Sequence, residues 1–118
     1  MPWEFDNDKP IYIQLVEKIQ FKIISGEIPI GEKLASVREL AQEAGVNPNT
    51  MQRALAELER QEIVFTNRTA GRFVTDDKDH IKDLRSKYAI NKIQEVTTAL
   101  AQLGYSKDEL VELIEESL

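Results

Sequence analysis

The side chains with the most specific chemistry in this chain of 118 residues lie close together, at positions 49 to 53. Asn49 and Gln52 carry amides that can form two hydrogen bonds to adenine, and Arg53 carries a guanidinium group that can form two to guanine. Thr50, between them, suits a phosphate oxygen or the methyl group of thymine. This set is typical of a segment that reads base edges in the major groove of DNA. For Arg53 an alternative is an ion pair with Glu57, four residues later.

These side chains need a helix that presents them at its amino end, and the sequence contains the signals for one. Asn47 is a favoured N-cap residue, and Pro48 follows it at the first helical position. We interpret Asn47 as a cap and not as a base contact, because capping satisfies helix amides without any partner. The helix is expected to continue to about Gln61, since an apolar stripe runs through Met51, Ala54, Leu55 and Leu58.

A shorter helix is predicted before it, over residues 36 to 44. Ser36 and Glu39 form a capping box, and Gly45 is a suitable terminator. Arg38 lies on the exposed side of this helix, and no acidic residue at helical spacing is placed to form an ion pair with it. We therefore expect Arg38 to contact a phosphate or a guanine. Ser36 caps the helix, and its hydroxyl group can also donate to the DNA backbone.

A β-hairpin is predicted after the second of these helices, because the β-prone runs 63–66 and 72–75 are separated by a turn-like segment at 67–71. Arg68 and Arg72 on this candidate wing are expected to reach the neighbouring backbone or the minor groove. Gly71 meets a turn requirement, and its bare backbone can also approach a phosphate. The residues predicted to bind DNA are Lys33, Ser36, Arg38, Asn49, Thr50, Gln52, Arg53, Arg68, Gly71 and Arg72.

Another helix is predicted at the amino end of the chain, over residues 10 to 25. Asp8-Lys9-Pro10 supplies an acceptor and a proline for its start, and Gly26 is a plausible stop. Trp3 and Phe5 precede it, and they are interpreted as side chains that cover the core or, alternatively, as part of a dimer contact. The predicted fold class is therefore mainly α with a small β-hairpin, a winged helix-turn-helix followed by a short two-helix C-terminal dimerisation region.

The C-terminal region is predicted to hold a long helix at 78–103 and a terminal helix at 106–118. Two amphipathic helices cannot bury their apolar faces alone, so these faces must dock on the winged helix, on a second copy of the chain or on both, and we expect a homodimer. This divides the chain into a DNA-binding domain, residues 1–75, and a helical dimerisation or effector region, residues 76–118. The predicted dimerisation residues are Ile81, Leu84, Tyr88, Ile93, Val96, Leu100, Leu103, Leu110 and Ile114.

The net charge of −6 argues against a DNA-binding protein, because most of the affinity of such proteins comes from neutralising phosphates. The charge is unevenly distributed, however. Residues 33–75 hold six basic and five acidic residues, a net charge of +1, whereas residues 76–118 hold six basic and ten acidic residues, a net charge of −4. Duplex binding depends on the field of one face, so the prediction stands with a reduced affinity.

Several function classes are excluded by what the sequence lacks. There is no cysteine for a disulfide or thiolate site, no apolar run that spans a membrane and no secretory signal, so we expect a soluble cytoplasmic protein. No nucleophile–base arrangement or phosphate-cradling loop is present, so no enzyme and no cofactor are expected. His80 lies among Asp77, Asp79 and Asp83; we interpret this group as a solvated helix end and not as a metal site.

Several motifs occur in a fixed order over residues 9–75. They are Pro10-Ile11-Tyr12-x-Gln14-Leu15, Gly26-x-Ile28, Gly31-x-x-Leu34-x-Ser36-Val37-Arg38-Glu39-Leu40-Ala41, Val46-Asn47-Pro48-Asn49-Thr50-x-x-Arg53-Ala54-Leu55-x-Glu57-Leu58 and Gly71-x-Phe73-Val74. Together they resemble the GntR family of bacterial transcription regulators, in which an Arg matching Arg38 is used on DNA. The short helical tail resembles the YtrA subfamily, which implies dimerisation and repression of a nearby operon, often one that encodes a transporter.

Three positions depart from the family pattern. Pro48 stands where many relatives carry an arginine that reads guanine, so the usual half-site is not expected. Thr69 replaces a common glycine in the wing, and because a β-branched residue resists positive φ, a reshaped wing tip is expected. Ala35 replaces a common proline before the second helix, with a small effect.

The sequence therefore predicts a transcription repressor that binds a palindromic operator in double-stranded DNA as a homodimer. Its two recognition helices would enter successive major grooves about 34 to 36 Å apart. An effector ligand, a metal or no effector at all remain open. The alternative is a winged-helix scaffold that binds protein through its acidic surface and apolar tail, since a fold alone does not determine function.

Overall fold

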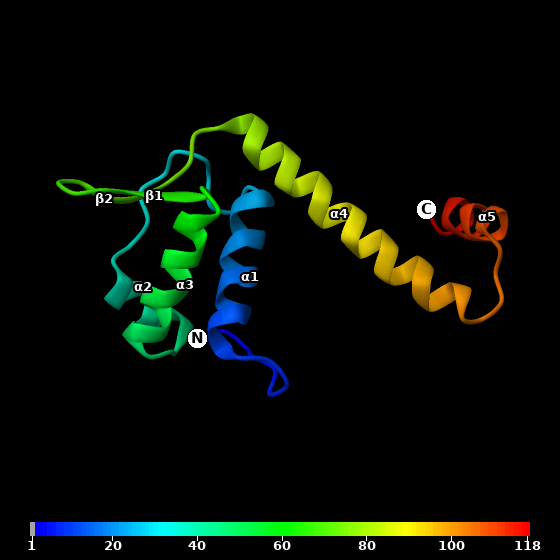
Figure 1. The fold of residues 1–118 in the computed structure, drawn as a ribbon, viewed down its shortest axis with the longest axis horizontal. Coiled ribbons are helices and arrows are strands. Elements are labelled where there is room, and N and C mark those ends of the chain that lie inside the picture. Colours follow the sequence, from blue (N-terminus) through cyan, green and yellow to red (C-terminus); the bar gives the residue numbers. More distant parts are fainter. Residues whose placement is uncertain (1) are drawn as a thin grey trace. The chain divides into compact units, whose positions relative to one another are not determined.

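A computed structural model describes residues 2–118, which are mainly α-helical with one small β-hairpin (Figure 1). The elements follow in the order α1, α2, α3, β1, β2, α4 and α5, which confirms the predicted fold class. The chain forms two compact units that divide between Lys82 and Asp83. The boundary drawn from the sequence, after residue 75, precedes the first turn of α4, and that turn belongs to the first unit.

The core of the first unit is formed by three helices, α1 (Ile11–Ile24), α2 (Val37–Ala44) and α3 (Pro48–Arg60). α1 runs beside α3, and α2 packs against α3 as well (Figure 1). Each helix has apolar residues every three or four positions, so each has one stripe to bury. Buried core residues include Leu15, Ile19, Ile23, Leu40, Ala41, Met51, Ala54, Leu55 and Leu58. α1 and α2 therefore cover one face of α3, and its other face is exposed to solvent.

The start of α1 is held by a buried glutamine and not by a side-chain cap. Pro10 occupies the N-cap position and makes no capping hydrogen bond, so the predicted acceptor before it is not used as a cap. Instead, Gln14 Nε2 donates to the carbonyl oxygens of Asp6 and Lys9 at 2.9 and 2.8 Å. Its Oε1 accepts from the backbone N–H of Asp6 at 2.7 Å. The amide is therefore fully used, as a buried polar group requires.

The predicted capping signals of the helix-turn-helix are confirmed. Ser36 Oγ accepts from the backbone N–H of Glu39 at 3.1 Å, and Glu39 Oε1 accepts in return from the backbone N–H of Ser36 at 3.3 Å. α2 ends at Gly45, whose φ of 76° is left-handed and whose N–H donates to the carbonyl of Ala41. The chain then turns through Val46 into α3.

Replacing Gly45 by alanine is expected to lower the free energy of unfolding by about 1 to 3 kcal/mol. An alanine at this φ is strained, and its Cβ would lie 2.8 Å from the Cβ of Pro2. Gly26→Ala is the matched control, because Gly26 has a φ of +87° but a Cβ added there would have no atom within 4 Å. Urea denaturation should show the larger loss for Gly45→Ala; equal losses would contradict the close packing of Pro2.

Both strands differ by one residue from their predicted bounds, and the end of α3 explains the later start of the first strand. After the cap at Gln61, Glu62 adopts a left-handed φ of 61°. The backbone N–H of Glu62 donates to the carbonyl of Glu59, and that of Ile63 donates to the carbonyl of Leu58. This is a Schellman motif formed without glycine. Because it uses the N–H of Ile63, the first strand begins one residue later than predicted.

The wing is an antiparallel pair, β1 (Val64–Asn67) and β2 (Gly71–Val74), with Val64 opposite Val74 and Phe65 opposite Phe73. A bridge between Lys33 and Phe73 adds the segment before α2 to its edge. At the tip, Asn67 Oδ1 accepts from the backbone N–H of Thr69 at 3.0 Å. The left-handed position is Gly71, with φ of +105°, so Thr69 does not need a positive φ.

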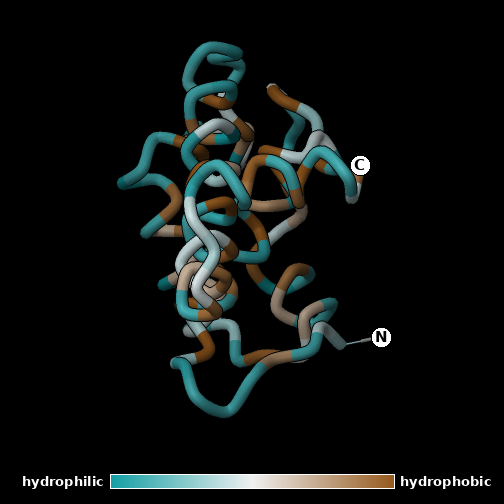
Figure 2. Tube along the Cα trace, turned by 90° about the vertical axis from the view of Figure 1, so that its right-hand side faces the viewer, coloured by the Kyte–Doolittle hydropathy of each residue, from teal (hydrophilic) through white to brown (hydrophobic). Residues whose placement is uncertain are grey.

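The second unit contains most of α4 (Lys78–Ala101) and all of α5 (Lys107–Ser117). α4 ends two residues before the predicted 103, because Leu103 and Gly104 form a turn with Leu100 and Ala101. Ser106 and Glu109 form the predicted capping box of α5. Near the C-terminus, hydrophobic residues occur among hydrophilic ones (Figure 2). Within residues 2–118, no helix has the length and apolar character needed to cross a membrane.

Candidate nucleic-acid interface

The amino end of α3 presents the polar side chains that the sequence singled out. Asn49 and Gln52 are exposed, and Thr50 is half-buried. Asn47 Oδ1 accepts from the backbone N–H of Asn49 at 2.8 Å, which confirms that Asn47 is a cap. Within residues 2–118 the side chains of Asn49 and Gln52 make no hydrogen bond with the chain itself, so their donors and acceptors are available to base edges.

Arg38 extends from α2 and is exposed. Among the residues that the structure describes, no ion pair or hydrogen bond involves its guanidinium group. The sequence predicted this freedom from the lack of an acid at helical spacing. Such a group keeps all five N–H donors for a phosphate or a guanine.

A groove between the wing and the segment before α2 brings five of the predicted residues together. It is lined by Lys33, Ser36, Arg68, Gly71 and Arg72, with Leu34, Val37, Glu39, Thr66 and Asn67 among their neighbours. Lys33 crosses Gly71 so closely that a Cβ there would lie 3.1 Å from Lys33 Cε. Arg68 at the tip is exposed and, within residues 2–118, unpaired. Gly71 thus serves the turn and gives room for the Lys33 side chain.

Arg72 differs from the other predicted cations, because it is already paired. Its Nε donates to Glu59 Oε1 on α3 at 2.8 Å, and its side chain is only 19% exposed. Thr66 on the opposite strand donates its hydroxyl to the same carboxylate oxygen. Glu59 therefore fastens both wing strands to the recognition helix. The primary role of Arg72 in the structure is to orient the wing, and its contact with DNA remains a prediction.

Low pH is expected to break the contacts of Glu59 with Thr66 and Arg72 of the wing. The hydrogen bond from Thr66 and the charge of Arg72 hold the pKa of Glu59 below its ordinary value. A carboxylate with a lowered folded pKa contributes stability that is present above its unfolded pKa, about 4.3, and is lost as the pH falls through the folded value. An NMR titration should therefore show the Arg72 Nε–H signal changing only below about pH 4. In Glu59→Gln this transition should be absent; its persistence would contradict the assignment.

Arg53 has a partner that the sequence did not predict. Its Cζ lies 3.6 Å from the ring centroid of Tyr12 on α1, a cation–π contact. The predicted alternative, a pair with Glu57, is not formed, because Glu57 binds Arg60 and Gln61. The Arg60 side chain donates to Glu57 and thereby lowers the pKa of that carboxyl group to about 2. Arg53, Asn49, Thr50 and Tyr12 line a shallow groove at the α1 side of α3.

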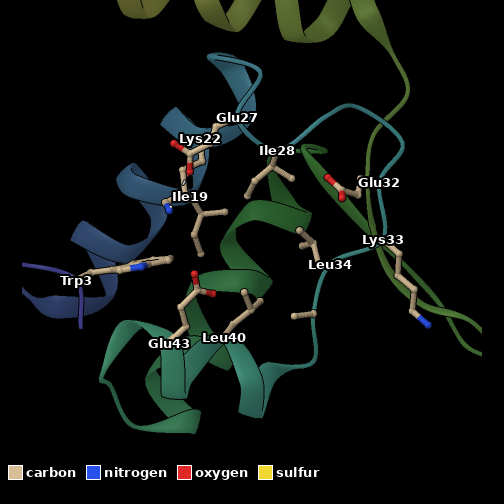
Figure 3. A pocket seen from close by; sticks show the side chains of 11 residues that line it. Trp3, Ile19, Lys22, Glu27, Ile28, Glu32, Lys33, Leu34, Leu40 and Glu43 are labelled. Carbon is tan, nitrogen blue, oxygen red and sulfur yellow. Dashed lines mark ion pairs between the residues drawn. The ribbon is translucent and has the colours of Figure 1, made fainter. Parts of the chain in front are cut away.

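A pocket elsewhere in the first unit shows how the N-terminal segment packs (Figure 3). The backbone N–H of Trp3 donates to the carbonyl of Ala44 at 3.2 Å, and Lys22 Nζ lies 4.6 Å from the Trp3 ring centroid. These contacts within the chain support the interpretation of Trp3 as core cover. The pocket has a volume of about 220 Å³. This is small for a ligand site, where about 300 to 1,000 Å³ is usual, and Lys33 points away from it (Figure 3).

The region around His80 acts as a helix start. Asp77 Oδ1 accepts from the backbone N–H of His80 at 3.1 Å, which caps α4. The His80 ring nitrogen Nε2 lies 3.0 Å from the carbonyl oxygen of Gln61, so it links this first turn to the end of α3. In the described part of the chain, residues 2–118, no group of three acidic, histidine or cysteine side chains is arranged to hold a metal ion.

Comparison with known proteins identifies the family of this chain. Residues 11–74, from α1 to the end of β2, match the model of the bacterial regulatory proteins of the gntR family. The chain belongs to this family. It is 36% identical over 109 residues to the HTH-type transcriptional regulator YhcF of Bacillus subtilis, an alignment that covers 92% of this chain and 90% of YhcF. It is 40% identical to the HTH-type transcriptional repressor YtrA of the same organism over 68 residues, 58% of this chain and 52% of YtrA.

Solved structures of similar proteins agree with this result. A GntR family transcriptional regulator from Listeria monocytogenes superposes with a TM-score of 0.87 and 40% identity, over 95% of this chain and 98% of that one. The DNA-binding domain of AraR in complex with operator ORR3 superposes with a TM-score of 0.55 and 29% identity, over 64% of this chain and 90% of that one. The predicted GntR membership is therefore confirmed, and the match to YtrA agrees with the YtrA-like assignment.

The protein is a GntR-type DNA-binding transcriptional regulator. The prediction that it is not an enzyme is confirmed by its relatives, which are transcriptional regulators. Sequence reasoning missed two residues of the interface region, Tyr12 and Glu59. In the sequence, Tyr12 was noted only as part of a family motif, and Glu59 only as one of the five acidic residues counted in residues 33–75. Both act on residues from other elements, a relation that helical spacing alone cannot reveal.

Proposed function

We propose that this GntR regulator represses transcription by binding a palindromic operator as a homodimer. The observation that carries the DNA contact is that the cation Arg38 on α2 is uncompensated within residues 2–118 and that the exposed amides of Asn49 and Gln52, at the start of α3, are free there too. A recognition helix enters the major groove with this end, where bidentate amide and guanidinium contacts distinguish base pairs.

The wing supplies the second part of the proposed surface. Lys33 and Arg68 lie along one groove, next to the hydroxyl group of Ser36. Ser36 Oγ accepts from Glu39, which leaves its own hydrogen free to donate to a phosphate oxygen. Contacts of this kind set the register of a protein on the duplex without reading sequence. The AraR domain, whose fold is similar, was crystallised with its operator, which supports the same role here.

The proposed dimer contact lies on the later part of α4. The dimerisation residues predicted on this helix form two sections, Ile81-Leu84-Tyr88 and Ile93-Val96-Leu100, separated by a step of five residues, and Leu103 follows in the turn after the helix. At about 100° per residue, that step rotates the stripe by roughly 140°. Ile81 is buried within the single chain, as is Leu110 on α5, whereas Ile93 and Val96 are 56% and 52% exposed. The second section, together with the exposed Ile114, is therefore the better candidate for contact with a second copy.

Repression is supported by the relatives and not by a residue of the site. YtrA is a transcriptional repressor, and it is 40% identical to this chain over 68 residues. A dimer on a palindrome places two recognition helices in successive grooves and can exclude RNA polymerase from a promoter. The regulated operon is proposed to lie near the gene of the regulator and to encode a transporter, as the YtrA-like resemblance implies.

Genome-wide footprinting in the organism's own cells would provide the operator, and titration of that duplex tests the proposal. We expect tight binding that weakens steeply with salt, because phosphate contacts release counterions. A duplex with one half-site inverted should bind more weakly. The proposal fails if the protein shows no binding to its footprinted or promoter DNA at low salt; this outcome would favour the protein-binding scaffold.

A further inference from the structure

The side chain of Arg53 is held in place before any DNA is present. Its guanidinium carbon lies 3.6 Å from the centre of the Tyr12 ring, within stacking distance. Tyr12 is half-buried on α1, whereas Arg53 is exposed on α3. No carboxylate within residues 2–118 pairs with Arg53. The ring thus restrains a long side chain that otherwise has many rotamers.

The contact with Tyr12 leaves the chemistry of the guanidinium group intact. Its five N–H donors point outward from its edges, and within residues 2–118 none of them is used in a hydrogen bond. The net positive charge is also retained, because the ring is neutral. An arginine paired with a carboxylate, such as Arg72 with Glu59, has lost part of both. Tyr12 therefore orders Arg53 without neutralising it.

The position of Arg53 on α3 indicates which part of a duplex it meets. Glu59 contacts the wing through Thr66 and Arg72, and Gln52, seven residues earlier, lies on the same side of the helix. Arg53 is turned about 100° from Gln52 and contacts α1 instead. It therefore flanks the recognition helix on the side away from the wing. The flanks of a helix in the major groove face the sugar–phosphate backbone.

We propose that Tyr12 is a positioning residue that holds Arg53 for contact with a DNA phosphate, on the flank of α3 opposite the wing. This inference rests on the proposed DNA-binding function and deepens it. Lys33 and Arg68, which line the groove beside the wing, bind one backbone strand, and the Tyr12–Arg53 pair binds the other. Neither residue of the pair reads sequence; together they set how deeply and at what angle α3 enters the groove.

The test measures binding of the full chain to its footprinted operator and to an unrelated duplex over a series of salt concentrations. Arg53→Ala should weaken both complexes similarly and should make the slope of log affinity against log salt shallower by about one. Each phosphate contact contributes about 0.9 to the slope of log affinity against log salt, so losing one contact corresponds to roughly an eightfold loss of affinity at 0.1 M salt. Tyr12→Leu should produce a loss in the same direction, whereas Tyr12→Phe, which keeps the ring, should bind like the native protein.

A double variant separates positioning from a merely structural role. If Tyr12 acts through Arg53, Tyr12→Leu should cause no further loss in the Arg53→Ala background. Phe5→Leu is the matched control, because Phe5 makes another cation–π contact with α1, through Lys18 at 5.7 Å. It should leave the salt slope unchanged. All affinities are compared at a temperature where thermal unfolding shows every variant to be folded.

The outcomes distinguish this inference from the function on which it rests. If the native protein and Tyr12→Leu bind the operator equally well, the positioning role alone is overturned. The same conclusion follows if Tyr12→Leu lowers the affinity equally in the presence and in the absence of the Arg53 side chain. A loss confined to one operator sequence would assign Arg53 to a base and overturn the phosphate contact. Absence of binding by the native protein defeats both proposals. Should Tyr12→Leu fail to fold, the Tyr12→Trp variant and the ring-current shift of the Arg53 Nε–H in the free native protein provide the same test.

Discussion

Replacing Arg38 by alanine is expected to weaken operator binding by about 1 to 3 kcal/mol, roughly 5- to 150-fold. The guanidinium group is exposed, and within residues 2–118 no carboxylate neutralises it. It therefore loses no ion pair within the chain when it binds DNA, and its full set of N–H donors is available. Fluorescence anisotropy with the operator duplex measures the change, while the free energy of unfolding should stay within about 0.5 kcal/mol of the native value.

The matched control for Arg38→Ala is Arg60→Ala. It removes the same charge from the first unit, but Arg60 Nε already donates to Glu57 at 2.9 Å, and the residue lies at the far end of α3 from Asn49. We expect a much smaller loss of affinity for this variant. Equal losses for the two variants would mean that only overall charge matters, and Arg38 would then have no place in the recognition surface.

Introducing aspartate at both Ile93 and Val96 is expected to convert the protein to a monomer and to lower operator affinity by at least about 100-fold. Both side chains are more than half exposed in the single chain, at 56% and 52%. Two carboxylates at these positions would be buried without partners in the proposed interface, which is strongly unfavourable. The affinity falls because each half-site must then be bound independently.

Sedimentation equilibrium reports the oligomeric state of this variant, and circular dichroism reports whether α4 remains helical. The control is Gln94→Asp, which adds a carboxylate at an exposed polar position of the same helix and should remain dimeric. Persistence of the dimer in the Ile93→Asp/Val96→Asp protein would place the interface elsewhere. A native protein that is monomeric at micromolar concentration would remove the proposed palindromic mode of binding.

Most of the fold could be predicted because its signals are local. The Ser36–Glu39 and Ser106–Glu109 capping boxes, the Asn47 cap and the terminator Gly45 all act within a few residues, and the structure shows each of them. One error occurred where a non-glycine residue adopted an unexpected conformation. Glu62 has a left-handed φ that cannot be predicted from its residue type, and this conformation shifts the start of β1 by one residue.

The candidate site was less predictable, because its remaining features join distant elements. Arg72 looked like a free wing cation, yet it is bound by Glu59, thirteen residues away on α3. Arg53 was expected to contact either DNA or Glu57, and its actual neighbour is Tyr12 on α1. Periodicity identifies which face of one helix is buried, but it does not say which side chain of another helix lies opposite. Arg38, which needed only the absence of local partners, was correctly predicted to be free of them within residues 2–118.

We propose that the start of α3, Arg38 and the wing together form the surface that binds operator DNA. NMR chemical shifts of amide and side-chain groups, followed during titration with the operator duplex, would map this surface. We expect the largest shifts at Arg38, Asn49, Gln52 and Arg68, with Arg53 on the other flank of the helix. Shifts confined to α4 and α5, with these residues unchanged at saturation, would contradict it.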